Sequence, residues 1–337
     1  MKRSLWLDNA RAFACMFVVL IHAVGPYMYS VSTPQHDYWV VANIIGSFAR
    51  VCVPLFFMIS GFIFFSEKKP SPSNFIRITC ALLFYSFLAI GYRVVFINDT
   101  DLVELLIKLP YQPAFYHLWF FYCIIPVYLA SYLFDFSKID TKLSLVSICM
   151  LFTLFNPTLF DLFPSVDNSE YSKDYSLMQD VYYYILYAAA GAVIGLMRIR
   201  ESRIKLVAFM GITIYIAASL CTMVYTHVTS EITLAYNEDY HRYNAIFVFV
   251  ASIGAFLVFR TYAFRNDYIQ MALSFISKHS LVIYGIHAFF ISFLEIFNLR
   301  FKRYYYFEIP IVFLGALGMS ILVSSIVRSI DRKRLVS

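Results

Sequence analysis

The chain has 337 residues, of which 61% are hydrophobic and only 14% are charged, and its formal net charge is +6. Soluble globular domains average about 25% charged residues, so this composition excludes an ordinary soluble domain and predicts an all-α, polytopic membrane protein. The length accommodates about ten membrane spans of roughly 20 residues in a single domain, residues 1–337, with no soluble domain beside them. Loop topology accounts for the basic excess, so no nucleic-acid partner is expected.

Ten apolar segments are predicted to span the membrane. Most of the 27 lysines and arginines fall in alternate connectors, which the positive-inside rule assigns to the cytoplasm. An even number of spans then places both termini in the cytoplasm. The first segment lacks the small-residue cleavage site of a signal peptide and is expected to be a retained span. The segments are 5–29, 39–65, 75–97, 117–136, 143–161, 178–197, 203–225, 242–262, 279–297 and 307–329.

The first segment, LWLDNARAFACMFVVLIHAVGPYMY, carries Asp8, Arg11 and His22 inside its apolar run. Ionisable side chains within lipid are costly and normally face a bundle interior or a wet cavity. Arg11 and His22 are eleven residues apart, about three helical turns, about 16 Å along the axis and about 20° in rotation. They therefore share one helical face with Asp8 and Cys15. Their separation means that they cannot hold one small group together.

The second segment contains ARVCVPLFFMISGFIFF, with Arg50 near the middle of the membrane. A functional site is one interpretation of this buried cation, and an ion pair with Asp8 or another carboxylate is the alternative. Pro54 is expected to kink the helix. Ser60 and Gly61 favour close helix packing, and Ser60 lacks the GxSxG pattern of a serine nucleophile.

Histidines and aromatic residues recur in the fourth and ninth segments. His117 and Trp119 begin the fourth segment, HLWFF, either as interfacial anchors or as walls of an acceptor site. Tyr284 and His287, in SLVIYGIHAFF, are three residues apart and share a helical face. The remaining histidines lack the ligand spacing of a zinc site, so no metal is expected.

The connector 298–307 departs from the charge rule, because Arg300, Lys302 and Arg303 fall on its outer side. Two interpretations stay open. The cluster pairs with anionic membrane lipid or glycan phosphate, or the last two segments are misplaced.

Four motifs occur in this order: LDNARAFACMFVVLIHA, VPLFFMISGF, HLWFF and SLVIYGIHAFF. Together they resemble the acyltransferase 3 family of integral membrane acyltransferases, and are similar to its enterobacterial common antigen O-acetyltransferase-like members. The resemblance extends from the first to the ninth segment. It implies a ten-span core that takes an acyl group, most often acetyl from cytoplasmic acetyl-CoA, and delivers it to a glycan hydroxyl on the outer side. The family's functional arginine and histidine correspond to Arg11 and His22.

The cytoplasmic R-x-x-R pair of the family is incomplete in this chain. Arg77 is present, but Asn74 and Cys80 stand at the flanking positions. Arg77 is therefore one expected ligand of the donor phosphates, and Lys68 and Lys69 are the alternative.

Acyl transfer from a thioester to a sugar hydroxyl requires a base and stabilisation of an oxyanion. Histidine suits the first task because its pKa is about 6.5. We expect His22 to activate the acceptor, by direct attack or through an acyl-histidine relay, and Arg11 to hold the donor, whose long pantetheine arm would bridge the gap. A structural hydrogen bond to another helix is the alternative for His22. The residues expected to bind substrate are Asp8, Arg50, Ser60, His117, Trp119, Tyr284 and His287.

A transporter or flippase for an anionic sugar or lipid precursor is the alternative function, with Arg11, Arg50 and His22 along its path. It predicts translocation without consumption of acyl-CoA. The enzyme hypothesis predicts a multi-pass protein of the bacterial cytoplasmic membrane whose partner is a glycan or a lipid-linked saccharide. Acetyl and succinyl both remain open as the acyl group.

Overall fold

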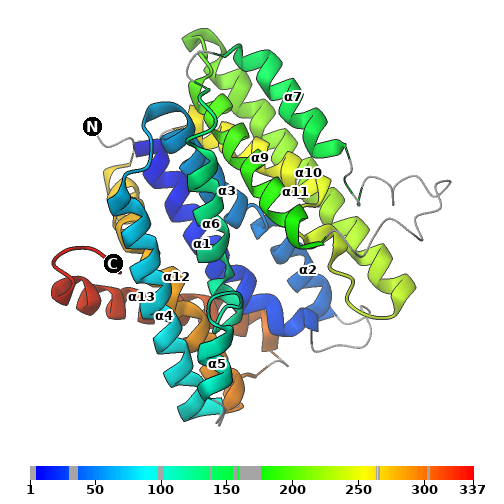
Figure 1. Ribbon diagram of the computed structural model, residues 1–337. Coiled ribbons are helices and arrows are strands. Elements are labelled where there is room, and N and C mark those ends of the chain that lie inside the picture. The colour runs from blue at the N-terminus through cyan, green and yellow to red at the C-terminus, as the bar shows by residue number, and fades with distance from the viewer. Residues whose placement is uncertain are drawn as a thin grey trace. The chain divides into compact units, whose positions relative to one another are not determined.

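The computed structural model describes residues 5–29, 37–97, 102–136, 139–154, 156, 158, 176–262, 264, 266–301 and 304–337. In this part of the chain the regular elements are all helices, as Figure 1 shows. The prediction of a helical polytopic bundle is confirmed.

Seven helical segments within these ranges are long and apolar enough to cross a membrane. They match the first, second, third, seventh, eighth, ninth and tenth predicted spans. The other three predicted spans contain shorter apolar helices, Tyr116–Ala130, Thr141–Thr153 and Asp180–Leu196. The seven long segments are Leu5–Tyr29, Asp37–Glu67, Pro72–Ile97, Glu201–Thr233, Asp239–Thr261, Asp267–Ile296 and Tyr305–Ile330.

The chain divides into two compact units. Unit 1 comprises Met1–Lys69 and Val127–Ser274, and unit 2 comprises Pro70–Pro126 and Phe275–Ser337. Two helices, α6 (Trp119–Ala130) and α12 (Asp267–Ile296), run from one unit into the other.

In unit 1, α10 packs along α11, α9 packs on both α3 and α7, and α1 contacts α2 and α3. Figure 1 shows α7, α9, α10 and α11, coloured green to yellow, lying side by side. The bounds of these helices are α1 Leu5–Tyr29, α2 Asp37–Ala49, α3 Cys52–Gly61, α7 Thr141–Thr153, α9 Ser176–Leu196, α10 Ile204–Thr233 and α11 Ile246–Thr261.

Glycines set the close approach of α3 to α9. A Cβ atom at Gly61 would lie 1.8 Å from the carbonyl oxygen of Ala188, and one at Gly191 would lie 2.1 Å from that of Met58. The two helix backbones therefore touch, which confirms the packing role predicted for Gly61.

The second predicted span is broken at Arg50. Pro54 has no N–H to offer the Arg50 carbonyl four residues earlier, and its ring would clash with a regular helix there. The Cys52 thiol lies 3.8 Å from that carbonyl oxygen instead, and the helical pattern resumes where Leu55 N donates to Val51 O at 3.0 Å. Pro54 thus kinks the segment as predicted and leaves Arg50 in the bend between α2 and α3.

Unit 2 contains α4 (Pro72–Tyr92), α5 (Leu102–Lys108), the 3-10 turn Tyr116–Leu118, most of α12 and α13 (Tyr305–Ile330). The segment after α13 folds back onto α4. The Tyr85 hydroxyl donates to the carbonyl of Val336 at 2.7 Å, and Arg77 donates to the Ser337 carbonyl oxygen at 3.0 Å.

A buried ion cluster joins α12 to α13. The Arg300 side chain, only 3% exposed, donates to the carboxylates of Glu308 and Glu295. Arg300 is therefore neutralised within the protein, and anionic lipid is not needed to explain it. Lys302 and Arg303, the other members of the expected basic cluster, lie outside the described residues.

Candidate functional site

The polar face of α1 begins with an ion pair. Asp8 Oδ1 lies 3.8 Å from Arg11 Nη1, with the carboxylate side chain 5% exposed and the arginine side chain 32% exposed. An acidic residue in the first turn also suits the positive end of the helix dipole. The buried Cys15 and the half-buried His22 follow on the same helix. Arg11 is thus oriented by Asp8 and still reachable by a ligand.

Asn9, which the sequence analysis did not single out, extends this end of α1. It is fully buried, and its amide exchanges two hydrogen bonds with that of Gln270 in α12, at 3.2 and 2.8 Å. Both residues belong to unit 1. This pair fixes the rotation of α1 about its axis and therefore the direction in which Arg11 and His22 point.

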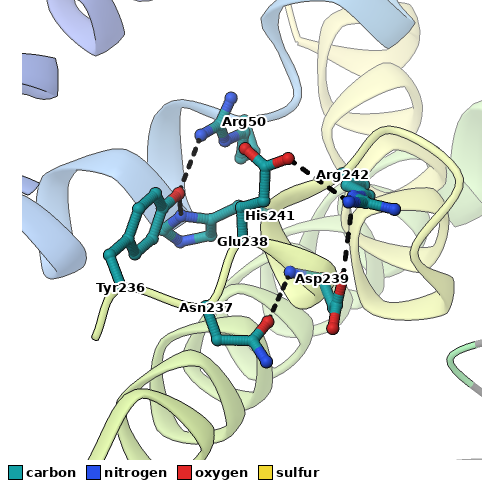
Figure 2. Close-up of polar contacts among 7 residues, drawn as sticks. All are labelled: Arg50, Tyr236, Asn237, Glu238, Asp239, His241 and Arg242. Carbon is teal, nitrogen blue, oxygen red and sulfur yellow. Dashed lines mark hydrogen bonds and ion pairs between the residues drawn. The ribbon is translucent and has the colours of Figure 1, made fainter. Parts of the chain in front are cut away.

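Arg50 heads a hydrogen-bonded chain that crosses unit 1, which we call the Arg50 cluster: Arg50, Tyr236, His241, Ser47 and Asn43. Arg50 Nη2 lies 3.5 Å from the Tyr236 hydroxyl, which lies 2.9 Å from His241 Nδ1. His241 Nε2 lies 2.9 Å from Ser47 Oγ, and Ser47 donates to Asn43 Oδ1 at 3.2 Å. In Figure 2 the Arg50 guanidinium and the His241 ring both point toward the Tyr236 hydroxyl.

The direction of these hydrogen bonds follows from the far end of the chain. Asn43 Nδ2 donates to the Met223 carbonyl at 3.0 Å, so Asn43 Oδ1 is an acceptor and Ser47 must donate to it. Ser47 Oγ then accepts from His241 Nε2–H, which leaves Nδ1 to accept from the Tyr236 hydroxyl. Both ring nitrogens of His241 are thus engaged in hydrogen bonds, so neither is free for base catalysis.

Arg50 does not form the ion pair with Asp8 or another carboxylate that the sequence analysis considered. Within the described part of the chain no carboxylate lies within 4.0 Å of its guanidinium, and Asp8 pairs with Arg11 instead. Arg50 also lies 5.8 Å from the Tyr243 ring centroid, a cation–π contact. The ion-pair interpretation is therefore wrong for these residues, and Arg50 keeps its positive charge inside unit 1.

In unit 2, His117, Tyr284 and His287 come together. The Tyr284 hydroxyl donates to the His117 carbonyl, and the two imidazole centroids lie 5.2 Å apart. His117 Nε2 donates to the Gly285 carbonyl at 3.2 Å, so Nδ1 carries the lone pair, and it has no hydrogen-bond partner among the described residues. His117 is buried in the 3-10 turn Tyr116–Leu118, directly before the half-buried Trp119 that begins α6. His117 thus keeps one ring nitrogen as an unsatisfied hydrogen-bond acceptor.

The three cations expected at the donor phosphates occupy different positions. Lys69 donates to the carbonyls of Ser131 and Phe134, just after the end of α6, within unit 1. Arg77, in unit 2, donates to Ser337, as described above. Lys68 is exposed, with its ammonium 5.9 Å from the Phe64 ring centroid. Among the described residues, the side chains of Lys69 and Arg77 donate to backbone carbonyls, whereas that of Lys68 does not.

Ser60 is half-buried in α3, next to the contact of Gly61 with α9. No group of three or more His, Cys, Asp or Glu side chains is placed to hold a metal within the described ranges. A small cavity of about 150 Å³ in unit 2 is lined by Arg93, Glu104 and Lys108 and by none of the predicted site residues. It is therefore separate from the sites described here.

Comparison with protein families gives one match. The model of a family described as an acyltransferase domain matches residues 4–328, nearly the whole chain. The searches of curated proteins and of solved structures gave no match. The matched range includes both α1 and the Arg50 cluster in unit 1, and the His117 group in unit 2.

Proposed function

The chain belongs to the acyltransferase 3 family, and from this premise we propose that this membrane acyltransferase is an O-acetyltransferase of the bacterial cytoplasmic membrane. It takes acetyl from cytoplasmic acetyl-CoA and transfers it to a hydroxyl of a cell-surface glycan or lipid-linked sugar. Similarity of the four motifs to the enterobacterial common antigen O-acetyltransferase-like members supports acetyl over succinyl. The basic connectors support cytoplasmic termini.

One observation carries the proposal: α1 presents an arginine and a histidine on one face, about 16 Å apart along the helix. Arg11 is held by Asp8 and is one-third exposed, so it can bind the donor's phosphates or polar arm while keeping a fixed orientation. His22 is half-buried farther along α1. The spacing matches a long donor molecule whose charged end and thioester lie at different depths.

In the transfer step, His22 accepts the proton of the acceptor hydroxyl as its oxygen attacks the thioester carbon. The new C–O bond gives a tetrahedral oxyanion, and the C–S bond then breaks as this intermediate collapses. The CoA thiolate leaves and takes up the proton from His22. We also propose substrate-binding roles for His117, Trp119, Tyr284 and His287, and a role for Lys68 at the donor phosphates.

The test is mass spectrometry of surface glycans from a deletion strain complemented with wild-type or variant protein. We expect His22→Ala to lower O-acetylation by about 10²–10⁴-fold, the usual contribution of a positioned base. The matched control is His227→Ala, because His227 is a histidine in α10 that is paired with Glu231 at 3.3 Å and is not among the predicted site residues. We expect it to retain wild-type acetylation.

His117→Ala distinguishes the two imidazoles. We expect it to weaken acceptor binding, raising KM more than it lowers kcat. If His22→Ala folds and still acetylates while His117→Ala does not, the base belongs to unit 2 and the assignment on α1 is wrong. If wild-type protein neither acetylates the glycan nor consumes acyl-CoA, the result would favour a transporter.

A further inference from the structure

The Arg50 cluster holds a positive charge that its own side chains do not neutralise. The Nε of Arg50 is buried and has no hydrogen-bond partner among the described residues. Burying a guanidinium without an anion is strongly unfavourable, and the penalty is larger in a membrane span, where water is scarce. The residue as a whole is half-buried.

The hydrogen bonds of the surrounding groups favour an acceptor rather than another donor as the partner of Arg50. The proton of the Tyr236 hydroxyl is committed to His241, and Tyr236 accepts from Arg50. This chain fixes one nitrogen of the guanidinium and leaves the Nε–H directed elsewhere. A group that only accepts hydrogen bonds, such as a carboxylate or phosphate oxygen, complements that N–H and the charge together.

Glu238 is an acidic residue two positions after Tyr236, and it is directed to a cation other than Arg50. Its carboxylate lies 3.4 Å from Arg242, which also contacts Asp239 at 3.7 Å, as Figure 2 shows. These three side chains are exposed, about half of their surface being accessible. Both carboxylates are therefore directed to Arg242, and neither lies within 4.0 Å of the Arg50 guanidinium.

The cluster lies at the His22 end of α1 rather than at the Arg11 end. The Tyr29 ring, in the last turn of α1, packs edge-on against Tyr236 with centroids 5.1 Å apart. A Cβ at Gly46 would lie 3.4 Å from Met28 and 3.5 Å from His241, so both flank α2 there. Tyr29 is seven residues, about 10 Å, beyond His22.

A break within a membrane span is also where binding sites are commonly built in membrane proteins, because the kink admits polar groups at that depth. Here the break contains Arg50 itself. We propose that the Arg50 cluster binds one anionic group, a carboxylate or a phosphate, of the saccharide acceptor. That the ligand is the saccharide acceptor depends on the proposed function. That the Arg50 cluster binds an anion depends only on the contacts of Arg50.

The test is thermal unfolding of the full-length protein in detergent, without acyl donor, titrated with glucuronate, with glucose 1-phosphate and with neutral glucose. We expect a saturable rise in Tm with one or both anionic sugars and none with glucose. The two anionic probes separate a sugar carboxylate from a sugar phosphate as the source of the charge. Equal responses to all three probes, or to none, would overturn the proposal.

Variants separate binding from structural support. We expect Arg50→Met to abolish the anion response while leaving the Tm of the unliganded protein unchanged or raised, because an uncompensated charge is removed. Tyr236→Phe should weaken the response several-fold by releasing the guanidinium. Arg242→Gln is the matched control, an exposed arginine of the same segment, and should respond as wild type. Arg50→Lys provides a folded charge-retaining variant should Arg50→Met fail to fold.

A lower Tm of unliganded Arg50→Met with an intact anion response would show a structural arginine and contradict the proposal. Because no acyl donor is present, the anion response of His22→Ala is independent of transfer. If the Tm still rises with anionic sugars in a protein that does not acetylate glycans, the anion site is supported and only the proposed function is refuted.

Discussion

Replacing Gly61 by alanine tests the contact that fixes α3 in unit 1. The added Cβ would lie 1.8 Å from the Ala188 carbonyl oxygen, whereas ordinary contact begins at 3.4 Å, so α3 and α9 must separate by about 1.6 Å. Overpacking usually costs about 1–3 kcal/mol. The added Cβ is fixed by the helix backbone and the Ala188 carbonyl is itself backbone, so neither can rotate away; we expect a cost of about 3 kcal/mol, a change of about 10²-fold in the unfolding equilibrium.

The assay is unfolding in mixed micelles of SDS and a non-ionic detergent, followed by intrinsic fluorescence. Gly91→Ala is the matched control, because Gly91 lies inside α4 and a Cβ there meets no atom within 4 Å. Alanine should stabilise a helix at that position by about 0.5–1 kcal/mol. Equal effects of Gly61→Ala and Gly91→Ala would refute the close approach of α3 to α9.

Two further predictions concern unit 2. Glu308→Gln should lower the free energy of unfolding by about 3–5 kcal/mol, because it removes a partner of the buried Arg300, and Glu295→Gln should have a smaller effect since Glu295 is partly exposed. The same detergent titration measures both, and the opposite order would contradict the ion cluster. Burial raises the pKa of Asp331, but hydrogen bonds, including one from Val336 N–H, outweigh it and lower the pKa overall. Stabilisation of the segment after α13 should therefore be present above the unfolded carboxyl pKa and lost as pH falls through the lower folded pKa. Hydrogen exchange of the Val336 amide, corrected for its intrinsic pH dependence, should show this loss. Asp331→Ala should abolish protection of that amide at all pH values. Unchanged protection in this variant would contradict the hydrogen bonds to Asp331.

The helical bundle could be predicted from the sequence because apolar runs report directly on membrane spans. The kink at Pro54 and the close packing at Gly61 could be predicted for similar reasons, since each depends on the residue's own backbone chemistry. The fourth predicted span, 117–136, ended too late because the chain turns at Ser131–Leu133 although the sequence there is still partly apolar.

The partners of buried charges were harder to predict. Tyr236 and His241 contact Arg50 and Ser47 across more than 180 residues of chain, and no local spacing reveals such a pair. The sequence did offer one unused signal at Arg300, because Glu308 stands in the first turn of the apolar helix that follows. A carboxylate in an apolar span calls for a nearby cation, and Arg300 is that cation.

The orientation of the proposed catalytic residues also could not be predicted from helical periodicity alone. Spacing placed Arg11 and His22 on one face of α1, but it could not identify Asn9 as the residue that fixes that face through Gln270. Likewise, the hydrogen bond that leaves His117 Nδ1 as a lone pair depends on a carbonyl in another helix. Such tertiary contacts set the chemistry of each imidazole.

The most direct test of the central claim uses protein reconstituted in vesicles, with labelled acetyl-CoA on one side and the glycan acceptor on the other. We predict that label appears on the acceptor in wild-type vesicles, and that Arg11→Gln and His22→Ala both abolish the transfer while His227→Ala does not. Undiminished transfer with folded His22→Ala protein, or acceptor movement across the membrane without release of CoA, would contradict it.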